Sequence, residues 1–251
     1  MLSVRKNILA CIAVFALFLL APALRAVADE TNWFQAGLES YRAGYLADAG
    51  TAFRNSLKQT VSAGVLQNLG NVEWHRERVG DAVLAWEQAL WVDPFNAAAR
   101  NNLQFAREAA QLESPELRWF EVASTWLPNS WWAWLTGLSL WTAVAAVVIP
   151  GVLRRRRSVW QQVVAAIGLG IFLLCVPAHV GTMTRAKIGF VLNPETRLRL
   201  TPTEGAETVT LLGAGEPVRS GHSRGKFIFV RTNRGSGWLD QEDVGLISQL
   251  R

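Results

Sequence analysis

The chain has 251 residues, of which 50% are apolar, and a net charge of +5. An excess of basic residues is typical of proteins that bind nucleic acid. Here Arg5, Lys6 and the arginines at 154–157 flank apolar segments, and without them the chain is close to neutral. We therefore attribute the positive charge to membrane topology and expect no nucleic-acid partner.

Residues 1–28 have the three parts of a secretory signal peptide. Arg5 and Lys6 form a short positive region, residues 8–23 are apolar, and Ala26-Val27-Ala28 matches an A-x-A cleavage site. An uncleaved signal anchor is the alternative and gives the same topology. Cleavage would remove Cys11 and leave Cys175 without a partner for an intramolecular disulfide.

Residues 29–112 contain two segments that align at an offset of 33 residues. Placing Gly37 on Gly70 aligns Trp33 with Leu66, Tyr41 with Trp74, Ala49 with Ala82, Phe53 with Trp86 and Ser56 with Ala89. The pattern resembles tetratricopeptide repeats, pairs of antiparallel helices with a period of about 34 residues. Pro94 ends the second unit as in that family, and the first unit lacks this proline. A third helix over 96–112 would cap the stack, and a generic helical hairpin domain is the alternative.

The resemblance implies a concave groove lined by the first helix of each unit. By register, Phe34, Leu38, Tyr41 and Arg42 would line it from the first unit, and Gln67, Asn71, Trp74 and His75 from the second. We select Phe34, Tyr41, Arg42, Gln67, Asn71 and Trp74 as partner-binding residues. Asn71 resembles the asparagine that binds ligand backbones in peptide-binding members, and a solvated polar helix face is the alternative. His75 has no second ligand at metal-binding spacing, so we expect no metal site.

Residues 113–130 form a linker rich in aromatic residues. Trp119, Ala123, Trp126 and Leu127 recur at helical spacing, with Glu116, Arg118 and Glu121 elsewhere on the turn. Tryptophan favours the headgroup region of a bilayer. The pattern predicts a short helix on the membrane surface, and an aromatic substrate-binding cluster is the alternative.

Two apolar runs follow, at 131–153 and 159–183. Each is long enough to cross a hydrocarbon core of about 30 Å as a helix. Four arginines occupy the turn at 154–158, so the positive-inside rule places this turn in the cytoplasm. Both soluble parts would then face the periplasmic side of a bacterial inner membrane. Neither run has an ionisable residue in its middle, which argues against an ion path.

In residues 186–251 the pattern changes to short apolar runs separated by turn residues, and it predicts five or six strands. Thr196–Pro202, Gly215–Val218 and Gly235–Leu239 resemble the start, middle and close of bacterial SH3 domains. Phe227 or Phe229 replaces a tryptophan that many members have. We expect a small all-β, SH3-like barrel.

The β segment also has a basic stretch without acidic residues, formed by Arg219, Arg224, Lys226, Arg231 and Arg234. It would meet anionic lipid or wall polymer, or form a solvated hairpin face. The G-x-S-x-G match at 221–225 lies in a small β segment with no histidine after it, so we do not interpret it as a nucleophile elbow. We expect no catalytic residue, no metal and no cofactor.

The order of these parts resembles the Bat aerotolerance family, specifically BatE-like proteins, over the full length. Members of that family are encoded beside MoxR-type ATPases and von Willebrand A-domain membrane proteins. The resemblance implies a non-enzymatic, membrane-anchored scaffold whose repeats bind partner proteins, including von Willebrand A-domain proteins. The alternative is an envelope sensor that binds cell-wall peptide or polymer through its SH3-like domain.

Overall fold

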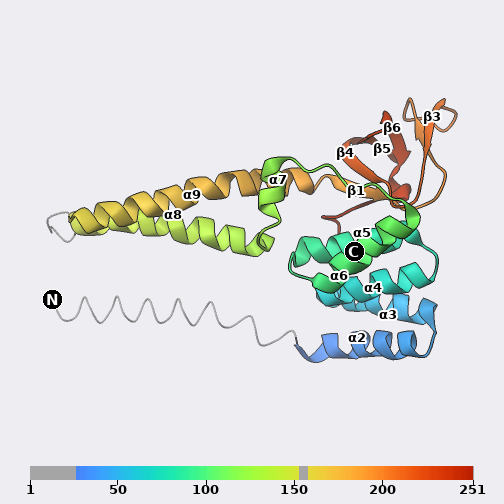
Figure 1. Cartoon of the computed structure of the whole chain (residues 1–251), viewed down its shortest axis with the longest axis horizontal. Coiled ribbons are helices and arrows are strands. Elements are labelled where there is room, and N and C mark those ends of the chain that lie inside the picture. Colours follow the sequence, from blue (N-terminus) through green and yellow to red (C-terminus); the bar gives the residue numbers. More distant parts are fainter. Residues whose placement is uncertain (1–26, 153–157, 251) are drawn as a thin grey trace. The chain divides into compact units, whose positions relative to one another are not determined.

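Figure 1 shows a computed structural model of the chain, which describes residues 27–152 and 158–250, with side chains from Trp33 onward. The signal-peptide prediction up to residue 26 and the four arginines of the turn lie outside the described residues. The described residues divide into two compact units between Val61 and Ser62. This boundary falls inside the segment 29–112 that the sequence pattern assigns to one domain.

The described part of the first unit is a helical hairpin of α2 (Val27–Arg42) and α3 (Leu46–Gln59). Gly44 lies in the turn with a φ of 81°, a conformation that glycine adopts without steric cost. Gly37 lies against the buried ring of Phe53, and a Cβ at this glycine would be 2.6 Å from the ring carbon Cε1. The two helices therefore touch where the sequence has glycine.

The second unit begins with α4 (Ala63–His75), α5 (Val79–Val92) and α6 (Ala97–Ala110). The hairpin of α4 and α5 repeats the contact of the first unit, because a Cβ at Gly70 would be 2.5 Å from Nε1 of Trp86. Helix α6 begins at a side-chain cap, in which Oδ1 of Asn96 accepts a hydrogen bond from the Ala99 amide at 2.9 Å.

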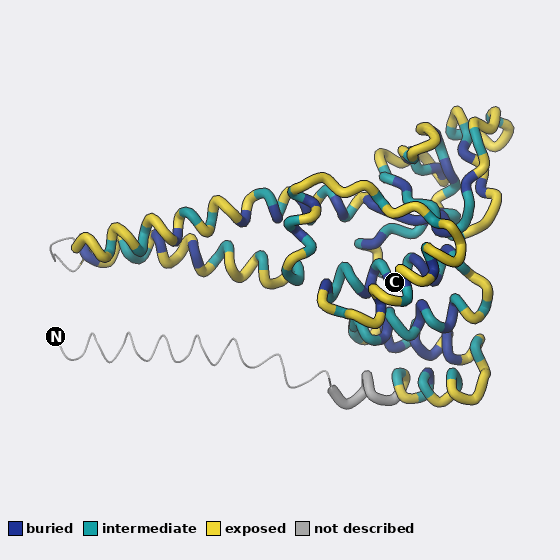
Figure 2. The backbone as a smooth tube through the Cα atoms, in the orientation of Figure 1, coloured by how far each residue is buried: buried dark blue, intermediate teal, exposed yellow. Residues whose placement is uncertain are grey.

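Three further helices follow, α7 (Trp119–Ser124), α8 (Asn129–Val152) and α9 (Val159–Arg185). At about 1.5 Å per residue, α8 and α9 extend ~36 and ~40 Å, more than the ~30 Å of a hydrocarbon core. By length and composition both helices are able to cross a membrane. Exposed residues follow both helices along their length in Figure 2.

Helices α8 and α9 pack against each other as an antiparallel pair. A Cβ at Gly168 would be 2.8 Å from the Ser139 carbonyl oxygen, so the small residue permits close approach. Thr136 Oγ1 and His179 Nε2 are joined by a hydrogen bond of 2.8 Å between the helices. Trp141 and Leu174 are 71% and 76% exposed, as expected of side chains that face lipid.

The described residues after α9 form an antiparallel sheet of seven strands in the order β3-β2-β6-β5-β4-β1-β7. The strands are β1 (Ile188–Val191), β2 (Thr196–Arg199), β3 (Thr208–Leu212), β4 (Pro217–Arg224), β5 (Phe227–Thr232), β6 (Gly235–Asp240) and β7 (Val244–Leu246). Its buried core includes Val191, Leu198, Leu212, Val230 and Leu239. The expectation of an all-β C-terminal part is confirmed, and β7 is the strand that the sequence pattern did not identify.

The sheet packs directly on α5. Nε2 of Gln88 donates hydrogen bonds to the carbonyl oxygens of Leu246 and Gln249, at 3.2 and 2.9 Å. Gly80 leaves no room for a side chain, since a Cβ there would be 2.3 Å from the Leu192 carbonyl oxygen. The second helical hairpin and the sheet therefore belong to one packed unit.

Candidate functional site

The predicted partner-binding residues of the first unit all lie on α2. Phe34 is half-buried, and its ring packs against Phe53 with ring centroids 5.9 Å apart. Leu38 and Tyr41 are also half-buried, while Arg42 is exposed at the end of the helix. Phe34 therefore contributes to the packing of its own hairpin, and Arg42 is the predicted residue most accessible to a partner.

The predicted residues of the second unit lie on α4, and two of them have partners inside the unit. Oδ1 of Asn71 accepts hydrogen bonds from Trp86 Nε1 at 3.1 Å and from Asn102 Nδ2 at 2.7 Å. These two bonds use the acceptor capacity of the amide oxygen, and the NH₂ donors remain for other contacts. Asn71 therefore helps to join α4 to α5 and α6.

Trp74 is held between two aromatic rings. Its ring centroid is 6.0 Å from that of Trp86 and 5.9 Å from that of Phe105, the latter edge to face. Gln67 is half-buried, and its backbone carbonyl oxygen accepts a hydrogen bond from Trp86 Nε1 at 3.2 Å. His75 is exposed at the end of α4. Trp74 thus has a structural role, whereas the side chain of Gln67 can be changed without breaking this packing.

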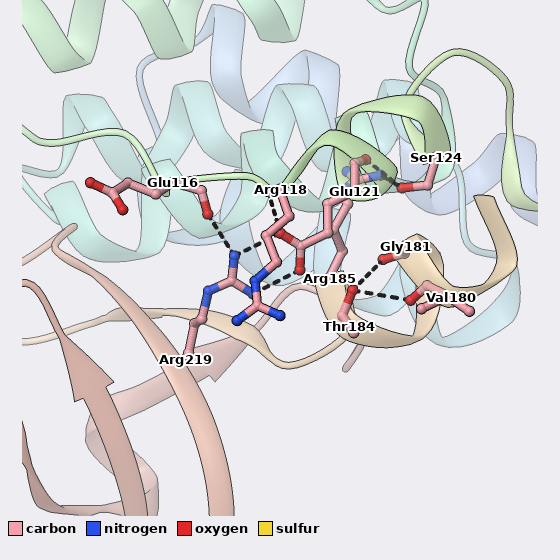
Figure 3. A network of polar contacts seen from close by, with 9 residues as sticks. All are labelled: Glu116, Arg118, Glu121, Ser124, Val180, Gly181, Thr184, Arg185 and Arg219. Atoms are coloured by element: carbon pink, nitrogen blue, oxygen red, sulfur yellow. Dashed lines mark hydrogen bonds and ion pairs between the residues drawn. The ribbon is translucent and has the colours of Figure 1, made fainter. Parts of the chain in front are cut away.

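A buried ionic junction lies elsewhere in the second unit, where α7 meets the sheet (Figure 3). Arg219 of β4 donates two parallel hydrogen bonds to Glu121 of α7, from Nη1 to Oε1 and from Nη2 to Oε2, both 2.8 Å long. The Arg118 amide donates a third bond to Oε2 at 2.8 Å. Glu121 is completely buried and the Arg219 side chain is 36% exposed. Such a bidentate pair is strong and directional.

The junction keeps Glu121 ionised. Burial alone would raise the pKa of this carboxyl, but the hydrogen bonds from Arg219, from the Arg118 amide and from Thr184, with the positive charge of Arg219, lower it to about 2. The carboxylate is therefore ionised near neutral pH. Arg219 also donates a bond of 2.5 Å to the Glu116 carbonyl oxygen, which holds the linker before α7.

The end of α9 joins the same junction through Arg185, which is buried. Its Nη1 donates a hydrogen bond of 3.2 Å to Oγ of Ser124 at the end of α7. Its guanidinium carbon lies 5.2 Å from the ring centroid of Trp91 in α5, a cation–π contact. Gly181 permits this arrangement, because a Cβ there would be 2.1 Å from the Phe120 carbonyl oxygen. Side chains of α5, α7, α9 and β4 thus meet in one place.

The sequence pattern did not identify this junction. It placed Glu121 outside the apolar face of α7, yet Glu121 is fully buried, while Trp119 and Trp126 are 72% and 66% exposed. Glu121 and Arg219 are 98 residues apart, so no local spacing connects them. The linker contains three glutamates, Glu113, Glu116 and Glu121, and no feature of the sequence distinguishes the buried one.

The basic stretch of the β segment is partly neutralised in three dimensions. Lys226 pairs with Glu204 at 2.5 Å and Arg234 with Glu216 at 3.2 Å, in addition to the pair of Arg219 with Glu121. The stretch is therefore not a uniform basic face.

Within the described part of the chain, no group of three or more His, Cys, Asp or Glu side chains is arranged to hold a metal ion. Comparison of the chain with protein-family models, with curated proteins and with solved structures finds no match.

Proposed function

We propose that this chain is a membrane-anchored scaffold whose helical hairpins bind partner proteins through α2 and α4. The observation that supports this proposal most directly is a contact that recurs after 33 residues. Gly37 lies against the ring of Phe53, and Gly70 lies in the same way against the ring of Trp86. A repeated helical hairpin built on a glycine–aromatic contact is what tetratricopeptide units require, and such repeats function by binding other proteins.

The membrane anchor is the pair α8 and α9. Their apolar side chains are largely exposed, which in water would be costly and in lipid is favourable. Exposed tryptophans lie at both ends of the pair, with Trp131 and Trp134 near the start of α8 and Trp160 near the start of α9. Aromatic residues at both interfaces are typical of spanning helices. The arginine-rich turn favours an inner-membrane hairpin with both soluble parts in the periplasm.

The family proposal extends this function to a particular assembly. A BatE-like protein would act within a Bat/MoxR-type envelope complex, and von Willebrand A-domain membrane proteins would be its partners. In that arrangement the C-terminal sheet, proposed to be SH3-like, supports the scaffold by packing on α5, as the bonds from Gln88 illustrate.

One observation supports the alternative, an envelope sensor that binds cell-wall peptide through the sheet. His222 stacks on Phe229 with ring centroids 5.3 Å apart, and Trp238 meets the edge of both rings. His222 is exposed, so this aromatic group is accessible to a ligand. Flat apolar groups of this kind contact peptides in many binding domains.

The two functions are separated by surface variants of the full-length protein. Arg42→Glu with Gln67→Glu reverses a charge on α2 and adds a negative charge on α4 without touching Asn71 or Trp74, whose loss would also disturb packing. Lys58→Glu with Gln59→Glu is the control, because it makes the same change of charge on exposed positions of α3. Partners are recovered by affinity purification from solubilised membranes at matched protein levels and quantified by mass spectrometry.

We expect the variant on α2 and α4 to reduce partner recovery about fivefold or more, as loss of an interface contact worth over 1 kcal/mol does. The control should retain recovery. Equal recovery from all three proteins would remove the helical hairpins as the binding surface. Loss of binding to cell-wall peptide in His222→Ala, with partner recovery unchanged, would favour the sensor. Deletion of residues 186–251 is a poor test, because it uncovers the face of α5 that holds Gln88.

A further inference from the structure

A hollow of about 350 Å³ lies beside the ionic junction, and four basic residues line it. They come from three places in the second unit, with Arg118 before α7, Lys187 after α9, and Arg219 and Arg231 on β4 and β5. The rest of the lining is Glu121, Thr184, Ser220, Gly221, His222 and Phe229. The linker, the end of a membrane helix and the sheet therefore contribute to one cationic site.

The positive charge of the hollow is largely uncompensated. Among the described residues that line it, Glu121 is the one acidic residue, and both of its carboxylate oxygens already bind Arg219. Arg231 lies directly opposite Arg219 in the register of β4 and β5. Like charges at such positions destabilise a sheet. Among the described residues, no ion pair includes Arg118, Lys187 or Arg231. The hollow thus combines three unpaired cations, an arrangement that favours an anionic ligand.

The position of the hollow indicates where that ligand comes from. Thr184 belongs to the last turn of α9, and Lys187 follows two residues after this helix ends. The exposed Trp119 lies next to Arg118 in the sequence. If α9 spans the bilayer, the hollow lies at the depth of the lipid phosphates, where tryptophan also prefers to lie.

We propose that this hollow binds the phosphate group of an anionic phospholipid from the leaflet at this end of α8 and α9. The planar guanidinium groups of Arg118 and Arg231 offer paired donors that match phosphate oxygens, and Lys187 adds a point charge. The lipid offsets the repulsion between Arg219 and Arg231 that the sheet alone leaves in place. This inference rests on the proposed membrane-spanning role of α8 and α9 and is independent of partner binding at α2 and α4.

The test uses full-length protein, delipidated in detergent, with bound lipid counted by native mass spectrometry. The probes are phosphatidylglycerol, which is anionic, phosphatidylcholine, which is zwitterionic, and inorganic phosphate. The variant Lys187→Gln with Arg231→Gln removes two cations from the hollow and leaves the pair of Arg219 with Glu121 intact. The control Arg197→Gln with Arg224→Gln removes two exposed cations of the same sheet that do not line the hollow. Membrane insertion of each protein is checked separately by carbonate extraction.

We expect one phosphatidylglycerol to bind the unmodified chain with an affinity about tenfold or more above that of the hollow variant. The control should stay within about twofold of the unmodified chain, and phosphatidylcholine should bind more weakly than phosphatidylglycerol. An equal loss of phosphatidylglycerol affinity in the hollow variant and in the control would overturn the site. It would mean that the lipid is attracted non-specifically to the positive charges of the sheet. Binding of inorganic phosphate as tight as that of the lipid would overturn the lipid source. Failure of the unmodified protein to insert into the membrane would refute the spanning role of α8 and α9. The lipid-binding measurement does not test that role.

Discussion

Replacement of Arg219 by methionine tests whether the ionic junction holds the sheet to α7. Methionine fills much of the volume of arginine but offers no donor to the carboxylate. In Arg219→Met, Glu121 would stay completely buried. It would lose both bonds from Arg219 and keep the bond from the Arg118 backbone amide. The variant therefore leaves a buried carboxylate without its cation.

The expected cost follows from the burial of the two partners. Breaking a buried ion pair by removing one partner typically costs about 3–5 kcal/mol. Arg219 is 36% exposed, so water replaces part of the lost interaction and the cost should fall below this range, at about 2–3 kcal/mol. The lowered pKa of Glu121 agrees in direction, because Arg219 is among the groups that hold this carboxyl ionised.

The assay is thermal unfolding of the full-length protein in detergent, followed by tryptophan fluorescence. For a unit of this size, each kcal/mol shifts the midpoint by about 2–4 °C, so Arg219→Met should lower it by about 5–10 °C at pH 7. Since the folded state lowers the pKa of Glu121, the pair stabilises the protein in full above about pH 4.5. This contribution is lost as the pH falls toward 2. The difference between the two proteins should therefore shrink over the same range.

Arg197→Met is the matched control, because Arg197 is an exposed arginine of the same sheet. A surface substitution of this kind usually changes stability by less than about 0.5 kcal/mol. If Arg219→Met and Arg197→Met lower the midpoint equally, the junction contributes nothing to stability. If the difference persists unchanged at pH 2.5, its origin is not the charge of Glu121. Either result would refute the reasoning above.

Two further predictions concern the helical hairpins and the membrane topology. Gly70→Val should lower the midpoint by several degrees, because its Cβ would lie 2.5 Å from the Trp86 ring, whereas Gly64→Val, with space around it, should not. With both native cysteines replaced, a cysteine at Ser236 should react with an impermeant thiol reagent on outer-permeabilised cells and one at Ser158 should not. The opposite labelling would reverse the proposed orientation.

The parts of the fold that follow from periodicity were predictable. The predicted membrane runs at 131–153 and 159–183 agree closely with α8 (Asn129–Val152) and α9 (Val159–Arg185). Apolar length alone determines such segments. The offset between Gly37 and Gly70 identified two glycines that both contact an aromatic ring. In both cases the information lies in residues close together or in a regular repeat.

Contacts between distant segments were not predictable in this way. Asn71 was assigned to a groove, and the structure shows in addition that its amide oxygen accepts bonds from Trp86 and Asn102. Its polarity is the same in either role, so residue type could not distinguish them. The strand β7 has only three residues, too few for an alternating pattern to be recognised. Its position in the sheet is determined by antiparallel pairing with β1, a contact that its own sequence does not indicate.

Arg219 belongs both to the junction and to the proposed lipid site, whereas Arg231 belongs to the lipid site alone. Comparing variants of these two arginines therefore separates the two proposals. Arg219→Met should reduce both thermal stability and lipid affinity, because the same guanidinium binds Glu121 and lines the hollow. Neutralising Arg231 should reduce lipid affinity alone. In lipid-free detergent it should even raise the midpoint, since it removes a like charge directly opposite Arg219. Opposite signs for stability and binding are expected where a protein retains repulsive charges in order to bind a ligand. A lower midpoint would mean that Arg231 supports the fold, and unchanged lipid affinity would mean that the hollow is not the binding site.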